Sequence, residues 1–277
     1  MAIPNLMAGP ALQRAGTRYD GPMAAWWETF FDTDYLRVWS GFITPAVTAE
    51  QAEGIWQLLE LREGSQVLDA PCGYGRLSRA LAERGAEVLG VDQSAVLLEQ
   101  AEKDRGDLPP ERLRYLRHDL RQPLAESGFD AAINIFTSLG YGTEEDDLAV
   151  LETLRRAVRP GGVVFLETNH RDTAAAFYSR VSRPANRLPD GTLVVEEPAF
   201  DPITGRVNIR WSWGGPAGQG EKSASLRLYT VTELVSLLAR AGLRLRSAHH
   251  GCSKEVFKAE GPEMGGRLGL LAERQAG

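Results

Sequence analysis

Two carboxylates and a pair of glycines are the residues of this chain whose types and spacing could do chemistry. An apolar run ends at Asp69, Gly73 and Gly75 follow shortly after it, and a helical pattern then begins. A turn built on glycines lets a ligand approach the main chain and the first turn of the next helix. A second apolar run ends at Asp92. The sequence therefore predicts two acidic strand ends beside one ligand-binding turn.

The pair of acids indicates what kind of ligand this turn would take. One carboxylate can orient an amine, and a short carboxylate can accept hydrogen bonds from both hydroxyls of a ribose. S-adenosylmethionine (SAM) carries an amine at one end and a ribose at the other. A nicotinamide dinucleotide is a weaker alternative, because its fingerprint has a third glycine where this chain has Ser78.

Apolar strand-like runs alternate with helical segments around these residues. A capping box at Thr48 predicts a helix that reaches about Leu61. Such alternation indicates a mostly parallel sheet with helices on both faces and a ligand at the carboxyl ends of the strands. The predicted strands are 66–69, 86–91, 112–117, 129–136 and 163–168, and the predicted helices are 75–84, 94–103 and one capped by Thr143.

The second half of the chain predicts a small antiparallel sheet inserted into this core. Along one of its strands Val207, Ile209 and Trp211 alternate with polar residues, which gives one apolar face. The inserted strands are predicted at 193–197, 206–213 and 223–229; a Thr230-capped helix and an antiparallel edge pair at 243–249 and 267–272 then complete the core. The expected organisation is an N-terminal arm and lid (1–47), a SAM-binding core (48–170), an inserted β lid (171–229) and a return to the core (230–277).

These features resemble the class I SAM-dependent methyltransferases, whose fold is a Rossmann-like, mostly parallel seven-stranded sheet. The resemblance covers residues 50–170 and, by pattern, 230–272. It rests on Asp69-x-x-x-Gly73-x-Gly75, Asp92, Asp119, the strand 129–134 and the turn Arg159-Pro160-Gly161-Gly162. The N-terminal arm is rich in aromatic residues between Met23 and Trp39. This arm and the insertion resemble those of small-molecule methyltransferases, so the resemblance implies methyl transfer to oxygen or nitrogen of a small molecule.

The resemblance implies roles for individual residues. The turn at 73–76 and Asp69 would hold the methionine part of the cofactor, Asp92 its ribose and Asp119 its adenine. The implied cofactor-binding residues are Tyr35, Asp69, Ala70, Gly73, Gly75, Arg76, Asp92, Gln93, Asp119, Leu120, Asn134 and Phe136. The implied substrate-binding residues are Trp39, Asn169 and Arg210, and the implied catalytic residues are Tyr141 and His170, the latter as a general base. No metal is expected.

Composition narrows the classes of partner. Lys and Arg number 31 against 37 Asp and Glu, a formal charge of −6, which disfavours nucleic acid as a partner. Arginines at 206, 210, 227, 244 and 246 leave an RNA methyltransferase open as an alternative, beside a non-catalytic nucleotide-binding module. Two distant cysteines and the lack of a long apolar run predict a cytoplasmic protein without a membrane span. The oligomeric state and the methyl acceptor stay open.

Overall fold

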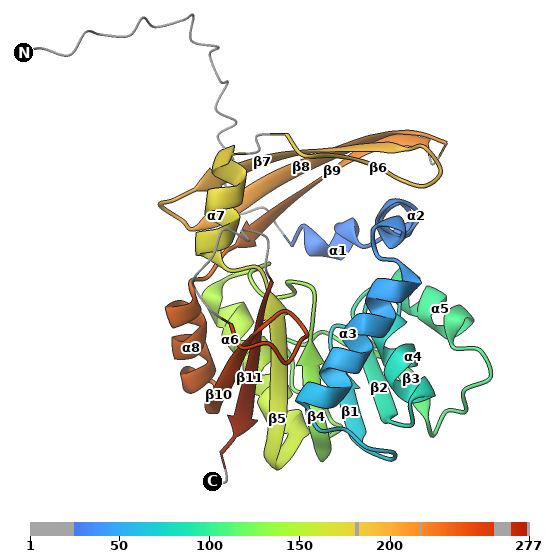
Figure 1. The fold of residues 1–277 in the computed structure, drawn as a ribbon, viewed down its shortest axis with the longest axis vertical. Coiled ribbons are helices and arrows are strands. Elements are labelled where there is room, and N and C mark those ends of the chain that lie inside the picture. Colours follow the sequence, from blue (N-terminus) through green and yellow to red (C-terminus); the bar gives the residue numbers. More distant parts are fainter. Residues whose placement is uncertain (1–24, 181–182, 217, 258–266, 276–277) are drawn as a thin grey trace, which may run out of the picture.

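The computed structural model describes residues 25–180, 183–216, 218–257 and 267–275, and its centre is a seven-stranded sheet (Figure 1). The five strands β1 to β5 are parallel, whereas β11 runs antiparallel to both of its neighbours. Across the sheet the order is β10 (Leu243–His250), β11 (Leu268–Arg274), β5 (Val158–Thr168), β4 (Phe129–Asn134), β1 (Gln66–Asp69), β2 (Glu87–Asp92) and β3 (Leu113–Arg117). The predicted Rossmann-like sheet and its antiparallel edge pair are confirmed.

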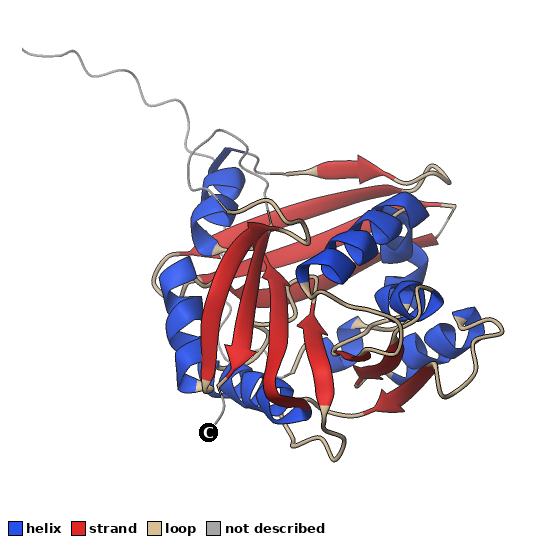
Figure 2. Ribbon diagram, turned by 60° about the horizontal axis from the view of Figure 1, so that its bottom comes forward, coloured by secondary structure: helices blue, strands red, loops and turns tan. Residues whose placement is uncertain are grey.

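Helices cover both faces of this sheet (Figure 2). On one face α3 (Pro45–Leu58) and α4 (Arg76–Glu83) pack over an apolar cluster centred on Ile55, Leu81 and Phe165. On the other face α6 (Glu144–Ala157) and α8 (Val231–Arg240) cover a second cluster. The remaining helix of the core, α5 (Ala95–Asp104), contacts β2 and β3. None of the described helices combines the length and apolar character needed to cross a membrane.

The capping boxes predict two of three helix starts. Thr143 and Asp146 cap α6, and Thr230 and Glu233 cap α8, each pair by a reciprocal side-chain and main-chain exchange. The prediction at Thr48 is wrong, because α3 begins one turn earlier. Thr44 is its N-cap, and Pro45 fills the first helical position, where a missing N–H costs nothing.

The inserted sheet is larger than the sequence pattern indicates. It contains β6 (Ala185–Arg187), β7 (Leu193–Asp201), β8 (Arg206–Gly215) and β9 (Gly218–Arg227), in that spatial order, and it follows the helix α7 (Arg171–Arg180). The predicted alternation holds, since Val207, Ile209 and Trp213 are buried. One end of this apolar face packs against α7 and the other end against the N-terminal helices. The three exposed residues of β6 carry no alternating pattern that would reveal a strand.

The N-terminal arm lies between the inserted sheet and the core (Figure 1). It forms α1 (Trp27–Phe30), α2 (Thr33–Trp39) and a 3₁₀ turn, η1 (Ser40–Phe42). Asp32 separates the two helices, because its side chain caps α2 at the Tyr35 N–H. The Trp26 indole donates to the Ser225 carbonyl of β9 (3.0 Å), and the Phe31 carbonyl accepts from Ser94 of the core (2.7 Å). Residues 1–24 of the predicted arm lie outside the described residues.

Candidate functional site

The glycine turn after β1 has the conformation that the motif requires. Gly73 and Gly75 have φ angles of +57° and +76°, a region that other residues rarely adopt. A Cβ at Gly75 would also lie 2.3 Å from the Tyr115 hydroxyl. Gly75 is the residue directly before α4, so the turn presents its main chain beside the N-terminus of that helix.

Asp69 ends β1 beneath this turn and is almost completely buried. It accepts a hydrogen bond from the Ser78 hydroxyl at 2.5 Å. Burial raises the pKa of Asp69 to about 7, and the bond from Ser78 opposes the rise. Ser78 occupies the position of the third glycine in a dinucleotide fingerprint. Here its hydroxyl instead orients the Asp69 carboxylate.

Asp92 ties the glycine turn to the end of β2. One of its oxygens accepts from the Gly73 N–H at 2.9 Å, and the other accepts from the Ser94 N–H at 2.8 Å. Its side chain is 6% exposed, and burial raises its pKa while the main-chain donors oppose this. Two fixed oxygens with free lone pairs can accept hydrogen bonds from a diol.

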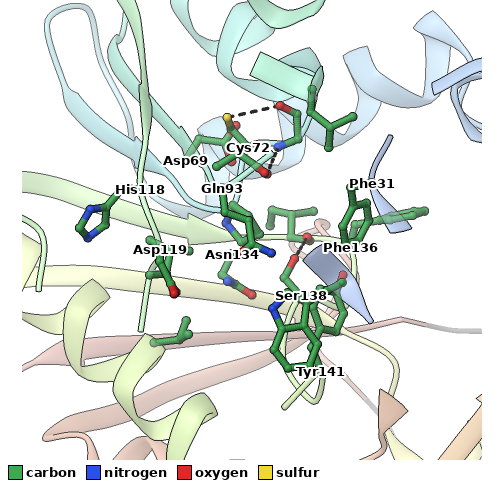
Figure 3. Close-up of a pocket in the computed structure, with 18 of the residues that line it drawn as sticks. Phe31, Asp69, Cys72, Gln93, His118, Asp119, Asn134, Phe136, Ser138 and Tyr141 are labelled. Atoms are coloured by element: carbon green, nitrogen blue, oxygen red, sulfur yellow. Dashed lines mark hydrogen bonds between the residues drawn. The ribbon is translucent and has the colours of Figure 1, made fainter. Parts of the chain in front are cut away.

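A cavity opens at the carboxyl ends of β1, β2 and β4, bounded on its far side by the arm (Figure 3). His118 and Asp119 lie on one side of it, Phe31, Phe136 and Tyr141 on the other, and Gln93 between them. The predicted residues that line it are Tyr35, Asp69, Gly73, Arg76, Asp92, Gln93, Asp119, Leu120, Asn134, Phe136 and Tyr141. The predicted residues outside its lining are Ala70, Gly75, Trp39, Asn169, His170 and Arg210.

Three of these outer residues support the lining. Trp39 stacks on Tyr35 with 5.6 Å between ring centroids, one layer behind the wall. The Ala70 carbonyl accepts from the Asn134 side chain at 2.9 Å. The Asn169 side chain accepts from Arg267 at 3.3 Å, and that guanidinium lies 4.9 Å from the centre of the Phe136 ring. Each of the three residues thus contacts a lining residue directly or through one neighbour.

His170 and Arg210 lie in other surroundings. The His170 ring is buried and packs edge-on against Phe257, with 5.4 Å between centroids. Neither ring nitrogen has a hydrogen-bond partner among the described residues, and burial lowers the pKa of the imidazole. Arg210 is half exposed and donates to Glu197 of the neighbouring strand at 2.9 Å. The structure does not bring either side chain into the cavity.

The side of the cavity around Asp119 combines charge with an aromatic ring. Arg121 donates to both Asp119 oxygens, with its Nη2 at 2.6 Å, and this pairing lowers the pKa of the carboxyl. The same guanidinium lies 5.6 Å from the centre of the Trp27 ring of the arm. Asp119 therefore lines the cavity with part of its accepting capacity already in use.

The opposite side is aromatic and includes a strained turn at the end of β4. Phe136 and Thr137 both have positive φ angles, at 71° and 60°. The Phe136 N–H donates to the buried Glu167 carboxylate at 2.8 Å, and Arg267 pairs with the same carboxylate. Phe136 is 42% exposed and lines the cavity.

Several lining residues were not predicted from the sequence. Trp27 and Phe31 are one helical turn apart, and that spacing could have placed both on one face of the arm. Asp147 looked like one of four acids at a helix start, yet it is buried and bonded to Gly140 and Tyr229. No local sequence signal identifies Arg121 or Ser138 as residues that line the cavity. Among the described residues, no cluster of three or more potential ligands is placed to hold a metal ion.

Comparison with known proteins agrees with this geometry. A family model described as a methyltransferase domain matches residues 67–162. The putative methyltransferase YqeM of Bacillus subtilis is 31% identical over 170 residues, which are 61% of this chain and 60% of that protein. The malonyl-[acyl-carrier protein] O-methyltransferase of Salmonella typhimurium is 39% identical over 118 residues, or 42% and 44% of the two chains. This chain thus spans about half of the length of these curated relatives.

Similarity to solved structures extends over most of the chain. The CcbJ methyltransferase of Streptomyces caelestis superimposes with a TM-score of 0.74 at 19% identity, covering 90% of this chain and 99% of the other. At 19% identity this match shows that the two proteins share a fold and nothing more specific. The sheet order and the glycine turn agree with the class I methyltransferase fold, and the family model places a methyltransferase domain at residues 67–162.

Proposed function

We propose that the protein transfers the methyl group of SAM to a nitrogen or oxygen atom of a small molecule. The observation that carries the proposal is the cavity at the carboxyl ends of the strands, where Asp69 and Asp92 lie on either side of the Gly73 turn. Asp69 would pair with the amine of the cofactor and Asp92 with its ribose hydroxyls. Gln93 and Leu120 would contact the adenine beside Asp119.

Arg76 provides a cation for the methionine carboxylate. Its guanidinium lines the cavity and donates to the neutral Gln51 side chain at 2.7 Å. No carboxylate among the described residues forms an ion pair with it, so its charge is available to a ligand. The ring of Phe136, 6.0 Å from the guanidinium, closes this part of the cavity.

The aromatic side of the cavity would hold the acceptor. The cofactor supplies an activated methyl group, so the protein has to align the nucleophile and exclude water. Phe31, Phe136 and Tyr141 line that side, and burial raises the pKa of the Tyr141 phenol above its usual range. A neutral phenol can exchange a hydrogen bond with an amine or a hydroxyl of the acceptor. His170 takes no part in this scheme, because it does not line the cavity, and its predicted role as a general base is still to be tested.

The surroundings of the five arginines argue against an RNA substrate. Arg206 binds main-chain carbonyls, and the other four lie within ion-pair distance of glutamates. Paired side chains contribute little to the basic stripe that RNA binding needs. The overall charge of −6 acts in the same direction.

Calorimetry and a labelling assay test the proposal. We expect S-adenosylhomocysteine (SAH), the demethylated cofactor, to bind with measurable heat and NADH to give none. With methyl-labelled SAM, the label should enter low-molecular-weight products from a cell extract. Label recovered in RNA, or NADH binding more tightly than SAH, would contradict the proposal.

A further inference from the structure

A single arginine of the inserted sheet binds the turn that carries Tyr141. The Arg206 guanidinium donates to three consecutive carbonyls, those of Gly140 (3.1 Å), Tyr141 (2.8 Å) and Gly142 (3.0 Å). Arg206 is the first residue of β8, whereas the turn belongs to the core between β4 and α6. Three converging carbonyls form a site that a planar guanidinium fills and an ammonium cannot fill as completely.

The other side of this turn is fixed as well. The Gly140 N–H donates to the buried Asp147 at 2.8 Å, and the Gly140 carbonyl accepts from the Arg227 N–H at 2.7 Å. Gly140 has a φ of +92°, and a Cβ there would lie 2.2 Å from the Arg227 carbonyl. The turn therefore packs tightly against the end of β9, and only glycine fits at position 140.

The same guanidinium shares a hydrogen-bond acceptor with the N-terminal arm. Its Nη2 donates to the Ser225 carbonyl at 2.8 Å, and its Nε donates to the Ser225 hydroxyl at 2.9 Å. That carbonyl also accepts from the Trp26 indole at 3.0 Å. Trp26 in turn contacts the Tyr141 ring, with 4.8 Å between centroids. Arg206 thus joins the inserted sheet to the core turn, and the Ser225 carbonyl that it shares with Trp26 links both to the arm.

We propose that Arg206 is a positioning residue that fixes Tyr141 in the wall of the cavity. The inserted sheet then does more than cover the site, because it sets the place of a side chain on its aromatic side. The description of that side as the acceptor end rests on the proposed function. The placement of Tyr141 by Arg206 does not, and it can be measured without cofactor or acceptor.

Chemical modification of the phenol tests this placement. Unliganded protein is treated with N-acetylimidazole, and acetylation of each tyrosine is quantified by mass spectrometry. Tyr141 should be protected in the native protein. Arg206→Met should raise its rate of modification about tenfold, because the closed turn loses several hydrogen bonds. Tyr115, which lies on β3 of the main sheet, should keep its rate and serves as the internal reference.

Arg274→Met is the matched control. Arg274 also donates to main-chain carbonyls, those of Arg156 (3.2 Å) and Val158 (2.6 Å), but at the end of the sheet where β5 begins. It should leave Tyr141 protected even if it lowers the melting temperature. If Arg206→Met does not fold, Arg206→Gln takes its place with the same two outcomes.

The proposal would be overturned if Tyr141 in a folded Arg206 variant were acetylated as slowly as in the wild-type protein. It would also be overturned if Arg274→Met raised the acetylation rate of Tyr141 as much as Arg206→Met does. The methyl-labelling assay and the SAH-binding measurement test the proposed function independently of tyrosine acetylation. A protein that transfers no methyl group would contradict the proposed function and leave the assignment of Arg206 intact. Once an acceptor is known, Arg206→Met should raise its KM more than it changes SAH affinity.

Discussion

The two sides of the cavity are built in different ways. The cofactor side consists of strand ends and the turns that follow them, with Asp92 held by the N–H of Ser94, two residues on, and by the N–H of Gly73 in the turn after β1. The aromatic side brings together the arm, the turn at 140–142 and the inserted sheet, joined by Trp26 and Arg206. The first side is formed by neighbouring strand ends of one sheet, whereas the second depends on contacts between the arm, the core turn and the inserted sheet. Changes on the first side should therefore act on the cofactor, and changes on the second on the acceptor.

The largest expected effect is at Asp92. Asp92→Ala removes the proposed acceptor for both ribose hydroxyls and also the bonds to Gly73 and Ser94. Affinity for SAH should fall at least about tenfold, the loss expected for charge-assisted hydrogen bonds. Calorimetry measures this directly, and a melting curve shows whether the variant is folded. SAH affinity unchanged in a folded Asp92→Ala protein would remove the ribose contact from the model of the site.

The pH dependence of SAH binding should report Asp69. Its pKa of about 7 means that the carboxylate is mostly protonated at pH 6 and mostly ionised at pH 8. Only the ionised form pairs with an ammonium group, so SAH affinity should rise with pH by about tenfold at most across this window. 5′-Methylthioadenosine lacks the amino-acid part and should show no such rise. A flat profile for SAH would mean that Asp69 does not meet the amine.

Arg76 offers a test confined to the methionine part of the cofactor. Arg76→Gln should weaken SAH binding about fivefold, as expected for one partly exposed ion pair, while 5′-methylthioadenosine binds as before. Arg79→Gln is the control, because Arg79 lies in the same helix and binds Asp104 and Glu83 at the surface. If both ligands weaken together in Arg76→Gln, the arginine supports the cavity rather than the carboxylate.

The contrast between the two sides also explains what the sequence could predict. The strands of the main sheet, the glycine turn and both acids follow from apolar runs, turn residues and spacing, which are local signals. The helix α7 and the strand β6 lack such a signal. Asp147 and Arg206 look like ordinary surface charges in the sequence, and only the packing of the inserted sheet against the core turn brings them together. The place of His170 beside Phe257 likewise depends on the return of the chain through β10 and β11.

The smallest expected effect separates the two predicted catalytic residues. Tyr141 lines the cavity and His170 does not, so Tyr141→Phe should lower acceptor turnover while His170→Ala changes it less than about twofold. SAH affinity should stay the same in both variants, because the proposed cofactor contacts are on other elements. Single-turnover rates with labelled SAM and the acceptor found in the labelling assay give this comparison. A tenfold loss in His170→Ala at unchanged SAH affinity would return the imidazole to the mechanism. It would also require the aromatic side of the cavity to rearrange when the acceptor binds, because both ring nitrogens now face a buried apolar environment.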